Sequence, residues 1–366
     1  MLPDMRATNP PKRVAVVGAG LAGAVAARRL ADAGHDVQVF DKSRGAGGRL
    51  ATRRAEWTDR QDAPRTTRLD HGAPGFAARD ERFRAFVAEA VGAGWLAPWA
   101  PVWASAGLGV EDGADLFVAV PEMPRLCREL LAGIDCGWNE PVEGLLRGGG
   151  RWRLRRRGVV LPDEYDIVVL AMPPVQAAPL LIPHAPGWAR TAARVAMRPC
   201  WTLMGISEPT RALLAWQAAR PPQGPLAWLI RNESRPGRER RDDEIHWVVH
   251  ARADWSAERL EAPGEQVQDE LEAAVDDWLG ESLRWKHAVV HRWRYALPPV
   301  ASVEPGQLHW WDRVQGLGVC GDFLGGSGVE GAWLSGTTLA EVVLAGGAGA
   351  RGRGASSGAD AAAEVA

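Results

Sequence analysis

The feature that most constrains this chain is a glycine-spaced turn between a short apolar strand and a helix. Gly18-Ala19-Gly20-Leu21-Ala22-Gly23 follows the strand-like "RVAVV" at 13–17 and opens "LAGAVAARRLADAG", which has helical spacing and ends at Gly34. In a GxGxxG turn, the first glycine permits the tight bend and the second lets a pyrophosphate approach the backbone. The third lets the helix pack closely on the strand. The free N–H groups at the start of such a helix then face the phosphates.

A second strand completes this unit. "HDVQVF" resumes the apolar pattern, and Asp41 closes it at close to the ~20-residue distance at which an acid binds the adenosine ribose. Both strands are nearly continuous in apolar character, as expected for a parallel sheet buried on both faces. Residues 13–41 therefore predict a βαβ unit that binds a dinucleotide, and a glycine-rich turn without a ligand is the weaker reading.

The basic run "DKSRGAGGRLATRR" at 41–54 allows three interpretations. It could be an arm for nucleic acid, a solvated loop, or an ordered turn that binds the pyrophosphate. The chain carries Lys+Arg 43 against Asp+Glu 45, a formal charge of −2, which argues against a general polyanion binder. Because the run begins at Asp41, it leaves the sheet edge where the phosphates are expected, so Gly48 and Arg49 (or Arg44) can reach them. Arg53 and Arg54 could simply face solvent.

A third glycine-rich element lies near the other end, in "CGDFLGGSGVEGAWLSG". Asp322 follows a strand and could accept a hydrogen bond from a polyol such as ribitol. A helix then starts at 328–331, and its N-terminal dipole would favour negative charge on a reduced isoalloxazine. An ordinary strand-to-helix turn is the alternative.

The remaining segments indicate a β-rich insertion. Residues 80–135 are predicted to be mainly helical, and strand-like segments follow between 200 and 296, interrupted by one helix with Val267, Leu271, Val275 and Trp278 on one face. We expect a discontinuous cofactor domain and a substrate domain. The predicted boundaries are 13–85, 136–180 and 290–345 for the cofactor domain, 86–135 and 181–289 for the substrate domain, and 1–12 and 346–366 for disordered ends.

The cysteine content and the hydropathy indicate the cellular compartment in which the protein is expected. The four cysteines are scattered without a CxxC pair, so neither a disulfide framework nor a metal site is predicted. The first twelve residues lack the apolar core of a signal peptide, and no run approaches the ~18 apolar residues of a membrane span. We expect a cytoplasmic protein that binds neither membrane nor nucleic acid.

Several ordered motifs carry a family resemblance across residues 13–345: "KSRGAGGRLATRR", "LDHGAPGFAARD", "VVLAMPP", "RPCW", "LAWLIRNESRPGR", "HRWRYA" and "CGDFLGGSGVEGAWLSG". The chain resembles the flavin-containing amine oxidase superfamily and, more closely, the bacterial members of the renalase family. The resemblance implies an α/β fold, with a Rossmann-like FAD-binding domain of the glutathione reductase and amine oxidase type and an inserted β-rich substrate domain. It implies FAD as the cofactor, and we expect noncovalent binding because no particular Cys or His stands out as an attachment point. Besides the motif residues Gly18, Gly20, Gly23 and Gly48, the implied FAD contacts are Leu21, Ala22, Asp41, Lys42, Arg49, Gly72, Ala73, Val142, Asp322, Val329 and Glu330.

The resemblance also implies an activity. Members of the renalase family oxidise isomers of NAD(P)H reduced at the wrong ring position, such as 2- or 6-dihydro-NAD(P), passing a hydride to flavin N5. O2 then re-oxidises the flavin and yields H2O2. The chain departs from the family at Pro74-Gly75-Phe76, where a Gln-aromatic pair is usual, and this puts the substrate's shape in doubt.

Two other functions stay open: a flavin amine oxidase with Lys286 near N5, and an FAD-binding module without turnover of its own. Hydride transfer chiefly requires alignment, so a general base need not be present. His71 and Tyr295 are the candidates for contact with substrate or flavin, each with a structural alternative. The residues for which a structural role is favoured are His291, Arg292, Trp201 and Trp333, although the two tryptophans could form an aromatic wall.

Overall fold

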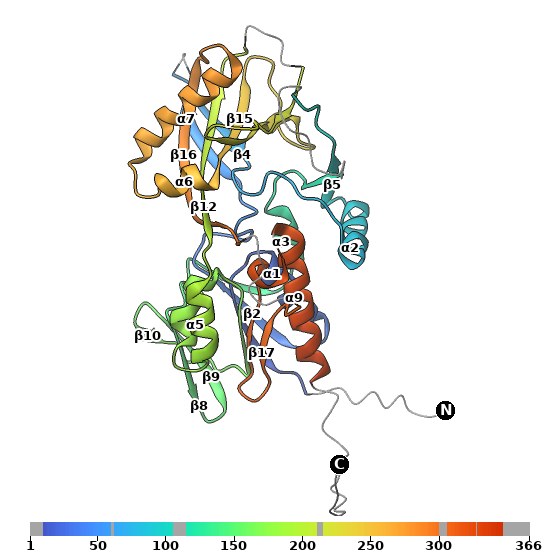
Figure 1. The fold of residues 1–366 in the computed structure, drawn as a ribbon. Coiled ribbons are helices and arrows are strands. Elements are labelled where there is room, and N and C mark those ends of the chain that lie inside the picture. Colours follow the sequence, from blue (N-terminus) through green and yellow to red (C-terminus); the bar gives the residue numbers. More distant parts are fainter. Residues whose placement is uncertain are drawn as a thin grey trace, which may run out of the picture.

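The computed structural model describes residues 10–59, 62–104, 115–210, 215–299, 306–326 and 328–346. Residues 1–9 and 347–366, which make up most of the two ends predicted to be disordered, lie outside the described residues. Two sheets, one above the other in Figure 1, organise the described part of the chain.

The first sheet is six-stranded and contains the predicted βαβ unit. Its order is β17-β18-β11-β1-β2-β7, and its neighbours pair in parallel except for β17 and β18. The strands are β1 (Arg13–Val17), β2 (Asp36–Asp41), β7 (Asp135–Trp138), β11 (Ile167–Leu170), β17 (Trp310–Asp312) and β18 (Leu317–Val319). Val14 and Val16 point to one face while Ala15 and Val17 point to the other, so β1 is buried on both sides.

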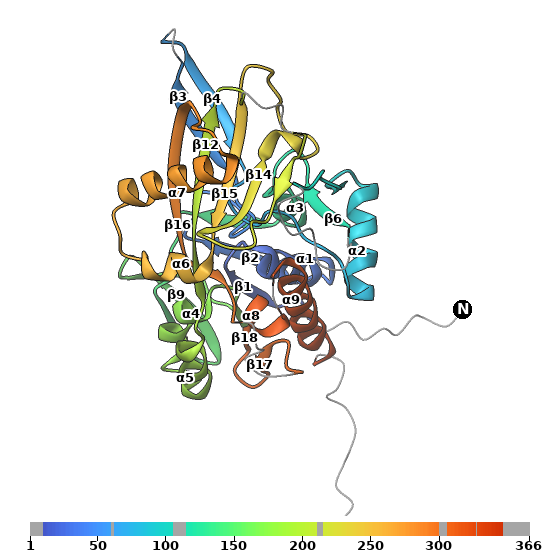
Figure 2. The same ribbon diagram turned by 45° about the horizontal axis from the view of Figure 1, so that its top comes forward.

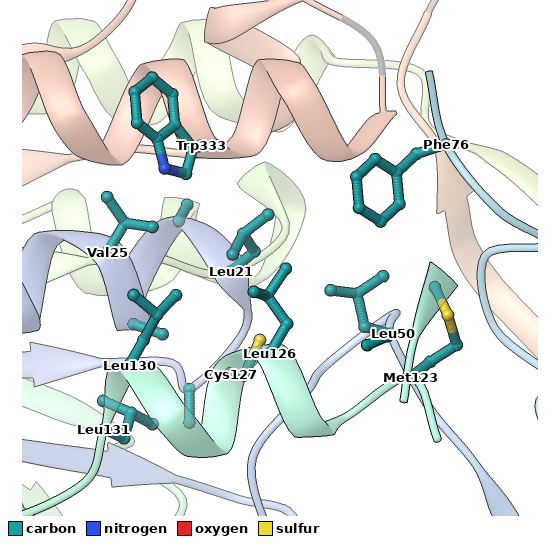
Figure 3. Packing of buried hydrophobic residues seen from close by; sticks show 14 of the residues in the cluster. Leu21, Val25, Leu50, Phe76, Met123, Leu126, Cys127, Leu130, Leu131 and Trp333 are labelled. Carbon is teal, nitrogen blue, oxygen red and sulfur yellow. The ribbon is translucent and has the colours of Figure 1, made fainter. Parts of the chain in front are cut away.

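Helices cover one face of this sheet. They are α1 (Leu21–Asp32), α3 (Arg125–Leu130) and α9 (Gly328–Ala345). A further helix, α2 (Glu81–Gly92), packs on α9, with Phe83 against Trp333. Figure 3 shows Leu21 and Val25 of α1 between Leu126 and Leu130 of α3 and Trp333 of α9. The opposite face is covered by β8 (Gly144–Gly148), β9 (Arg151–Arg156), α4 (Pro174–Leu181), α5 (Pro186–Arg194) and α8 (Asp322–Gly325). The short strand β10 (Val159–Val160) pairs with β9 and is exposed.

The second sheet is five-stranded and antiparallel, with the order β13-β14-β15-β12-β16. Its strands are β12 (Arg198–Ser207), β13 (Ala218–Ala219), β14 (Leu226–Arg231), β15 (Ile245–Ala251) and β16 (Trp285–Leu297). Figure 2 shows these strands above the first sheet, with α6 (Ala253–Glu258) and α7 (Gly264–Leu279) beside them. The amphipathic helix predicted from the sequence is α7, and its Val267, Leu271 and Val275 are fully buried against the sheet.

Two hairpins complete the fold: β3 (Arg53–Thr58) with β4 (Pro64–Leu69), and β5 (Leu96–Trp99) with β6 (Leu116–Ala119). The prediction that 80–135 is mainly helical is therefore wrong in part, because β5, β6 and the start of β7 lie in that range. The short apolar run at 116–119 pairs with 96–99, and such tertiary pairing overrides local helical preference.

The division into domains stays a prediction. The structure places all of β16 in the second sheet, including the part beyond residue 290. It places α5, within the predicted substrate domain, on the first sheet.

Candidate functional site

A single large cavity connects the glycine turn of the first sheet to the second sheet. Its volume is about 1670 Å³, above the ~300–1,000 Å³ of ordinary small-molecule pockets, so it has room for a dinucleotide and a second molecule. Of the predicted cofactor and catalytic residues, the ones that line it are Gly18, Gly20, Leu21, Ala22, Asp41, Lys42, Gly48, Arg49, His71, Gly72, Ala73, Val142, Tyr295, Asp322, Val329 and Glu330. Gly23 lies behind this lining.

The glycine turn shows why side chains are excluded from it. Gly18 has φ +118°, and a Cβ there would lie 2.2 Å from the carbonyl oxygen of Ala171. A Cβ on Gly23 would lie 1.9 Å from the carbonyl oxygen of Gly18, so this third glycine lets α1 approach the turn closely. Gly23 therefore shapes the cavity indirectly, by allowing α1 to pack against the turn.

Asp41 ends β2 beside this turn. Its carboxylate accepts hydrogen bonds from the backbone N–H of Ala19 at 2.6 Å and of Ser43 at 2.7 Å. A carboxylate has about four lone-pair sites, so it can still accept bonds from ribose hydroxyls. The neighbouring Lys42 donates to Gln176 at 3.1 Å, which holds a cation at the same end of the cavity.

Arg49 makes a contact that the sequence did not indicate. Its guanidinium donates two hydrogen bonds of 2.7 Å to the two carboxylate oxygens of Asp322, and one of 3.1 Å to the carbonyl of Ala296. The Asp322 side chain is only 4% exposed. The two predicted cofactor residues, from opposite ends of the chain, thus form one charged pair at the cavity wall. Arg44, the alternative to Arg49, is exposed on the protein surface.

Glu330 lies in the first turn of α9. Its carboxylate accepts hydrogen bonds from the backbone N–H of Arg79 at 2.6 Å and of Asp80 at 3.0 Å. These bonds fix the start of α9 against the segment that leads into α2. The N-terminal turn of α9, with Val329 and Glu330, lines the cavity, and its contact with a flavin stays a prediction.

The segment Asp70–Ala73 connects the two halves of the site. On the side of the first sheet, the N–H of Gly72 donates to Ala51 at 3.2 Å and the N–H of Ala73 donates to Arg49 at 3.0 Å. On the side of the second sheet, Trp293 Nε1 donates to the carbonyl of His71 at 3.0 Å and His250 Nε2 donates to that of Gly72 at 2.8 Å. Both sheets therefore determine where this segment lies.

A buried ionic cluster holds the beginning of the segment. Asp70 accepts hydrogen bonds from Arg235 at 3.3 Å and from Arg238 at 2.8 Å, and the three side chains are 1%, 0% and 4% exposed. Burial alone would raise the pKa of Asp70, but the two guanidinium groups outweigh it and hold the pKa below its usual range. Thr52 and Asn232 bond to the same residue, so Asp70 is fixed from several elements.

His71 is a neutral imidazole at the cavity wall. Its ring stacks on Trp293, with centroids 5.1 Å apart, and meets His291 edge-on at 4.8 Å. Burial, followed by the effects of His291 and Arg53, lowers the pKa of His71 to about 3. Its Nδ1 is buried and has no hydrogen-bond partner among the described residues.

His250 is a second neutral imidazole, on β15. Burial and then the charge of Arg235 lower its pKa to about 4. Since its Nε2 donates to a carbonyl oxygen, the neutral ring carries its proton on Nε2. The sequence analysis did not single out His250, and nothing in its local pattern, "IHWVVHAR", separates it from a core histidine.

The aromatic wall of the cavity differs from the one considered from the sequence. Trp201 and Trp333 are core residues: Trp201 donates to Arg259 at 3.0 Å, and Trp333 packs on Phe83 and Phe86. The aromatic side chains that line the cavity on the second-sheet side are Trp228, Trp293 and Tyr295. Strand alternation in "HRWRYA" places Trp293 and Tyr295 on one face, a signal that could have identified Trp293.

The departure at Pro74-Gly75-Phe76 changes the cavity wall. The backbone of Phe76 pairs with Phe117, at 3.1 and 2.8 Å, and its ring packs on Phe83. Phe76 is 6% exposed and belongs to the core shown in Figure 3. Pro74, Gly75 and Phe76 all line the cavity, and none of their side chains can donate or accept a conventional hydrogen bond.

Lys286 lies away from the cavity. Its Nζ donates to the carbonyl of Asp243 at 2.9 Å and lies 3.5 Å from Glu244. Within the described ranges, no group of three or more His, Cys, Asp or Glu side chains is placed to hold a metal ion. None of the described helices has the length and apolar character required to cross a bilayer.

Comparison with known proteins bears on the fold of the chain. Residues 16–90 match the NAD(P)-binding Rossmann-like domain family. L-amino acid oxidase Lm29 of Lachesis muta is 54% identical over 50 residues, and the L-amino-acid oxidase of Mus musculus is 51% identical over 51 residues. Each match covers 14% of this chain but only 10% and 8% of the relatives, so the chain spans about a tenth of their length.

Solved structures match over nearly the whole chain. Cyclohexylamine oxidase from Brevibacterium oxydans IH-35A has a TM-score of 0.65 at 15% identity, covering 92% of this chain and 99% of that one. Putrescine oxidase bound to putrescine has a TM-score of 0.63 at 12% identity, with the same coverage. The predicted fold class is confirmed: a Rossmann-like dinucleotide-binding unit carries an additional antiparallel sheet, as in the amine oxidase structures.

Proposed function

We propose that the protein is a renalase-like, FAD-dependent oxidase that takes a hydride from a reduced nicotinamide-type ring such as that of 2- or 6-dihydro-NAD(P). The observation that supports this most is the continuity of the cavity, from the glycine turn beside Asp41 to the aromatic and imidazole wall of the second sheet. A dinucleotide and a flat second molecule can lie in it together. The substrate half is the part of the cavity beside β12, β15 and β16.

The residues present fit noncovalent FAD. Gly18 and Gly20 leave the backbone accessible, and Asp41 offers acceptors for a ribose. Arg49 uses three of its five N–H donors on Asp322 and Ala296, so two remain for a pyrophosphate. The start of α9 provides a positive dipole end at the opposite part of the wall. When bound, FAD would accept the hydride at N5 and return the two electrons to O2, which is released as H2O2.

The chain's own residues would orient the substrate ring and exclude water. Trp293 offers a flat, partly buried surface stacked on His71, and Tyr295 lines the same cavity. Because the pKa of His71 is about 3, its ring stays uncharged across the physiological range. No proton has to leave the substrate before hydride transfer, so alignment between two flat rings is the main requirement.

Oxidation of an amine is the second candidate, because the chain shares its fold with cyclohexylamine oxidase and putrescine oxidase. The lysine that would support it, Lys286, binds Asp243 and Glu244 instead of facing the cavity. An FAD-binding module without turnover is the third.

Two measurements test the proposal. The absorbance spectrum of the purified protein, before and after denaturation, should show a flavin that is released into solution. Anaerobic mixing with 2- or 6-dihydro-NAD(P) should then bleach the flavin, while cyclohexylamine and putrescine should leave it unchanged. Bleaching by the amines alone would establish the second candidate, and bound flavin that no compound bleaches would favour the third.

A further inference from the structure

The charged residues that line the cavity are unevenly distributed. On the dinucleotide side, acidic and basic side chains are nearly balanced: Asp41, Glu140, Asp322 and Glu330 face Lys42, Arg49 and Arg79. On the side of the second sheet, the charged lining residues are Arg198, Arg252, Arg292, Arg294 and Asp254. The chain as a whole is close to neutral, so this excess of arginine is local.

These four arginines, named here the arginine edge, come from one end of the second sheet. Arg198 begins β12 and is in register with Leu297 at the end of β16. Arg252 directly follows β15, whose His250 is in register with Thr202 of β12. Because neighbouring strands are antiparallel, the start of β12 and the ends of β15 and β16 lie together. The register therefore brings all four arginines to the same end of the sheet, where all four line the cavity. Arg292 and Arg294 alternate with Trp293 and Tyr295, so they reach the cavity from the other face of the edge strand β16, where they contact Glu261.

Two members of the arginine edge carry charge that no carboxylate balances in the described structure. Arg198 donates to the carbonyl of Pro298 at 3.4 Å, and Arg252 donates to the carbonyls of Gly224 at 2.9 Å and of Pro221. A carbonyl oxygen orients a guanidinium group but leaves its unit charge in place. The two bonds of Arg252 also restrict its side chain, which lowers the entropy cost of binding an anion.

The other two members share a single carboxylate. Arg292 lies 3.2 Å and Arg294 lies 2.6 Å from Glu261, whose side chain is 70% exposed. One acid thus faces two guanidinium groups, and an exposed pair of this kind is weakly held. An incoming anion could replace Glu261 at modest cost.

We propose that the arginine edge binds a phosphate-bearing tail of the substrate, a diphosphate in particular, while the ring lies against Trp293. Guanidinium groups bind phosphate oxygens in bidentate fashion, and several together suit a diphosphate. The inference rests on the proposed function in assigning the other half of the cavity to FAD. It adds a basis for selectivity, since the same charges repel a cationic amine.

The test uses the FAD-loaded protein, so that the dinucleotide half is occupied. Inorganic pyrophosphate is titrated by calorimetry at low and high salt. Binding should be detectable at low salt and weaken as salt is added. The double variant Arg198→Gln with Arg252→Gln should weaken it at least about tenfold, which corresponds to about 1.4 kcal/mol. Arg198→Lys should retain most of the affinity.

A matched control separates binding at this site from a general effect of positive charge on the protein. Arg284 is 69% exposed and pairs with Glu208 away from the cavity, so Arg284→Gln should leave pyrophosphate binding unchanged. Should the double variant lose its flavin, Arg198→Gln alone and Arg292→Gln with Arg294→Gln replace it. If pyrophosphate does not bind, or binds equally well to these variants, the proposal is overturned.

A second readout keeps this inference distinct from the proposed function. Wild-type protein should be reduced more readily by 6-dihydro-NAD than by the corresponding phosphate-free riboside, and the arginine variants should lose that preference. If neither compound bleaches the flavin but pyrophosphate binding depends on the arginine edge, the proposed oxidation is wrong and the anion site stands. Equal reduction of wild type by both compounds would contradict the anion site alone.

Discussion

The two halves of the cavity are built by different means. The dinucleotide half is organised around backbone: glycines that exclude side chains, helix N-termini, and Asp41 bonded to the turn beside it, with a few charged side chains around them. The substrate half consists of side chains brought together from β12, β15 and β16, which are distant in sequence. The first arrangement suits a ligand shared by many proteins, and the second can vary with the substrate. Substitutions in the two halves should therefore have different effects on the protein.

The largest effect is expected from Gly23→Ala. The new Cβ would lie 1.9 Å from the carbonyl oxygen of Gly18, so α1 and the turn must separate. Overpacking of this kind costs about 1–3 kcal/mol or more of unfolding free energy. FAD content per chain, measured by absorbance, should fall sharply.

Gly92→Ala is the matched control, because this helical glycine of α2 has no atom within 4 Å of its Cβ position. It should raise the unfolding free energy by about 0.5–1 kcal/mol. Equal stability of the two variants in urea would show that close packing at Gly23 is unimportant.

A smaller effect is expected from Arg49→Met. It leaves the carboxylate of Asp322, which is 4% exposed, without its charged partner. Breaking a fully buried pair costs ~3–5 kcal/mol, and because Arg49 is a third exposed we expect about 1–3 kcal/mol here. Arg49→Met combined with Asp322→Asn should recover much of the loss in urea unfolding. A double variant no more stable than Arg49→Met would mean that the unpaired carboxylate is not the cause.

The histidines of the substrate half should make stability depend on pH. The pKa of His250 is about 4 in the folded protein and near 6.5 in the unfolded chain, so the unfolded state binds more protons between these values. The unfolding free energy should therefore fall as pH drops below about 6.5, by on the order of 2 kcal/mol at pH 5 for one such histidine. Above pH 7 this contribution is fully present.

His250→Gln separates this effect from the carboxylates, because the amide can still donate to Gly72 but does not titrate. Its pH profile should be flatter than that of the wild type between pH 6.5 and 4.5. An unchanged slope in thermal or urea unfolding would assign the dependence to other groups.

The smallest effect is expected from Lys286→Met. Lys286 binds Asp243 and Glu244 outside the cavity, so the rate of flavin bleaching should change by no more than about twofold. Lys42→Met, at the dinucleotide end of the cavity, serves as the contrasting variant and should weaken FAD binding. Strong loss of bleaching in Lys286→Met would revive the amine oxidase alternative.

The sequence reveals the dinucleotide half well because its chemistry is local. Gly18, Gly20 and Asp41 lie within one βαβ unit, and their spacing alone indicates the turn and the ribose acid. The β-rich insertion and the helix α7 also follow from hydrophobic periodicity. The helical prediction for 80–135 failed where β5 and β6 pair, since short apolar runs do not distinguish a strand from a buried helix.

The substrate half is harder to predict because its contacts depend on register between distant strands. Nothing near His250 shows that its Nε2 meets Gly72, 178 residues away. The pairing of Arg49 with Asp322, which are 273 residues apart, cannot be predicted from the sequence either. Trp201 and Trp293 both occur in apolar strand patterns, yet only the second lines the cavity.

The segment Asp70–Ala73, bonded on one side to Arg49 and Ala51 and on the other to His250, Trp293 and Arg238, has a thermodynamic consequence. Neither sheet can melt without breaking buried bonds that the other sheet depends on. The two sheets should therefore unfold together in one cooperative transition. Calorimetry should record one heat-absorption peak with matching calorimetric and van't Hoff enthalpies.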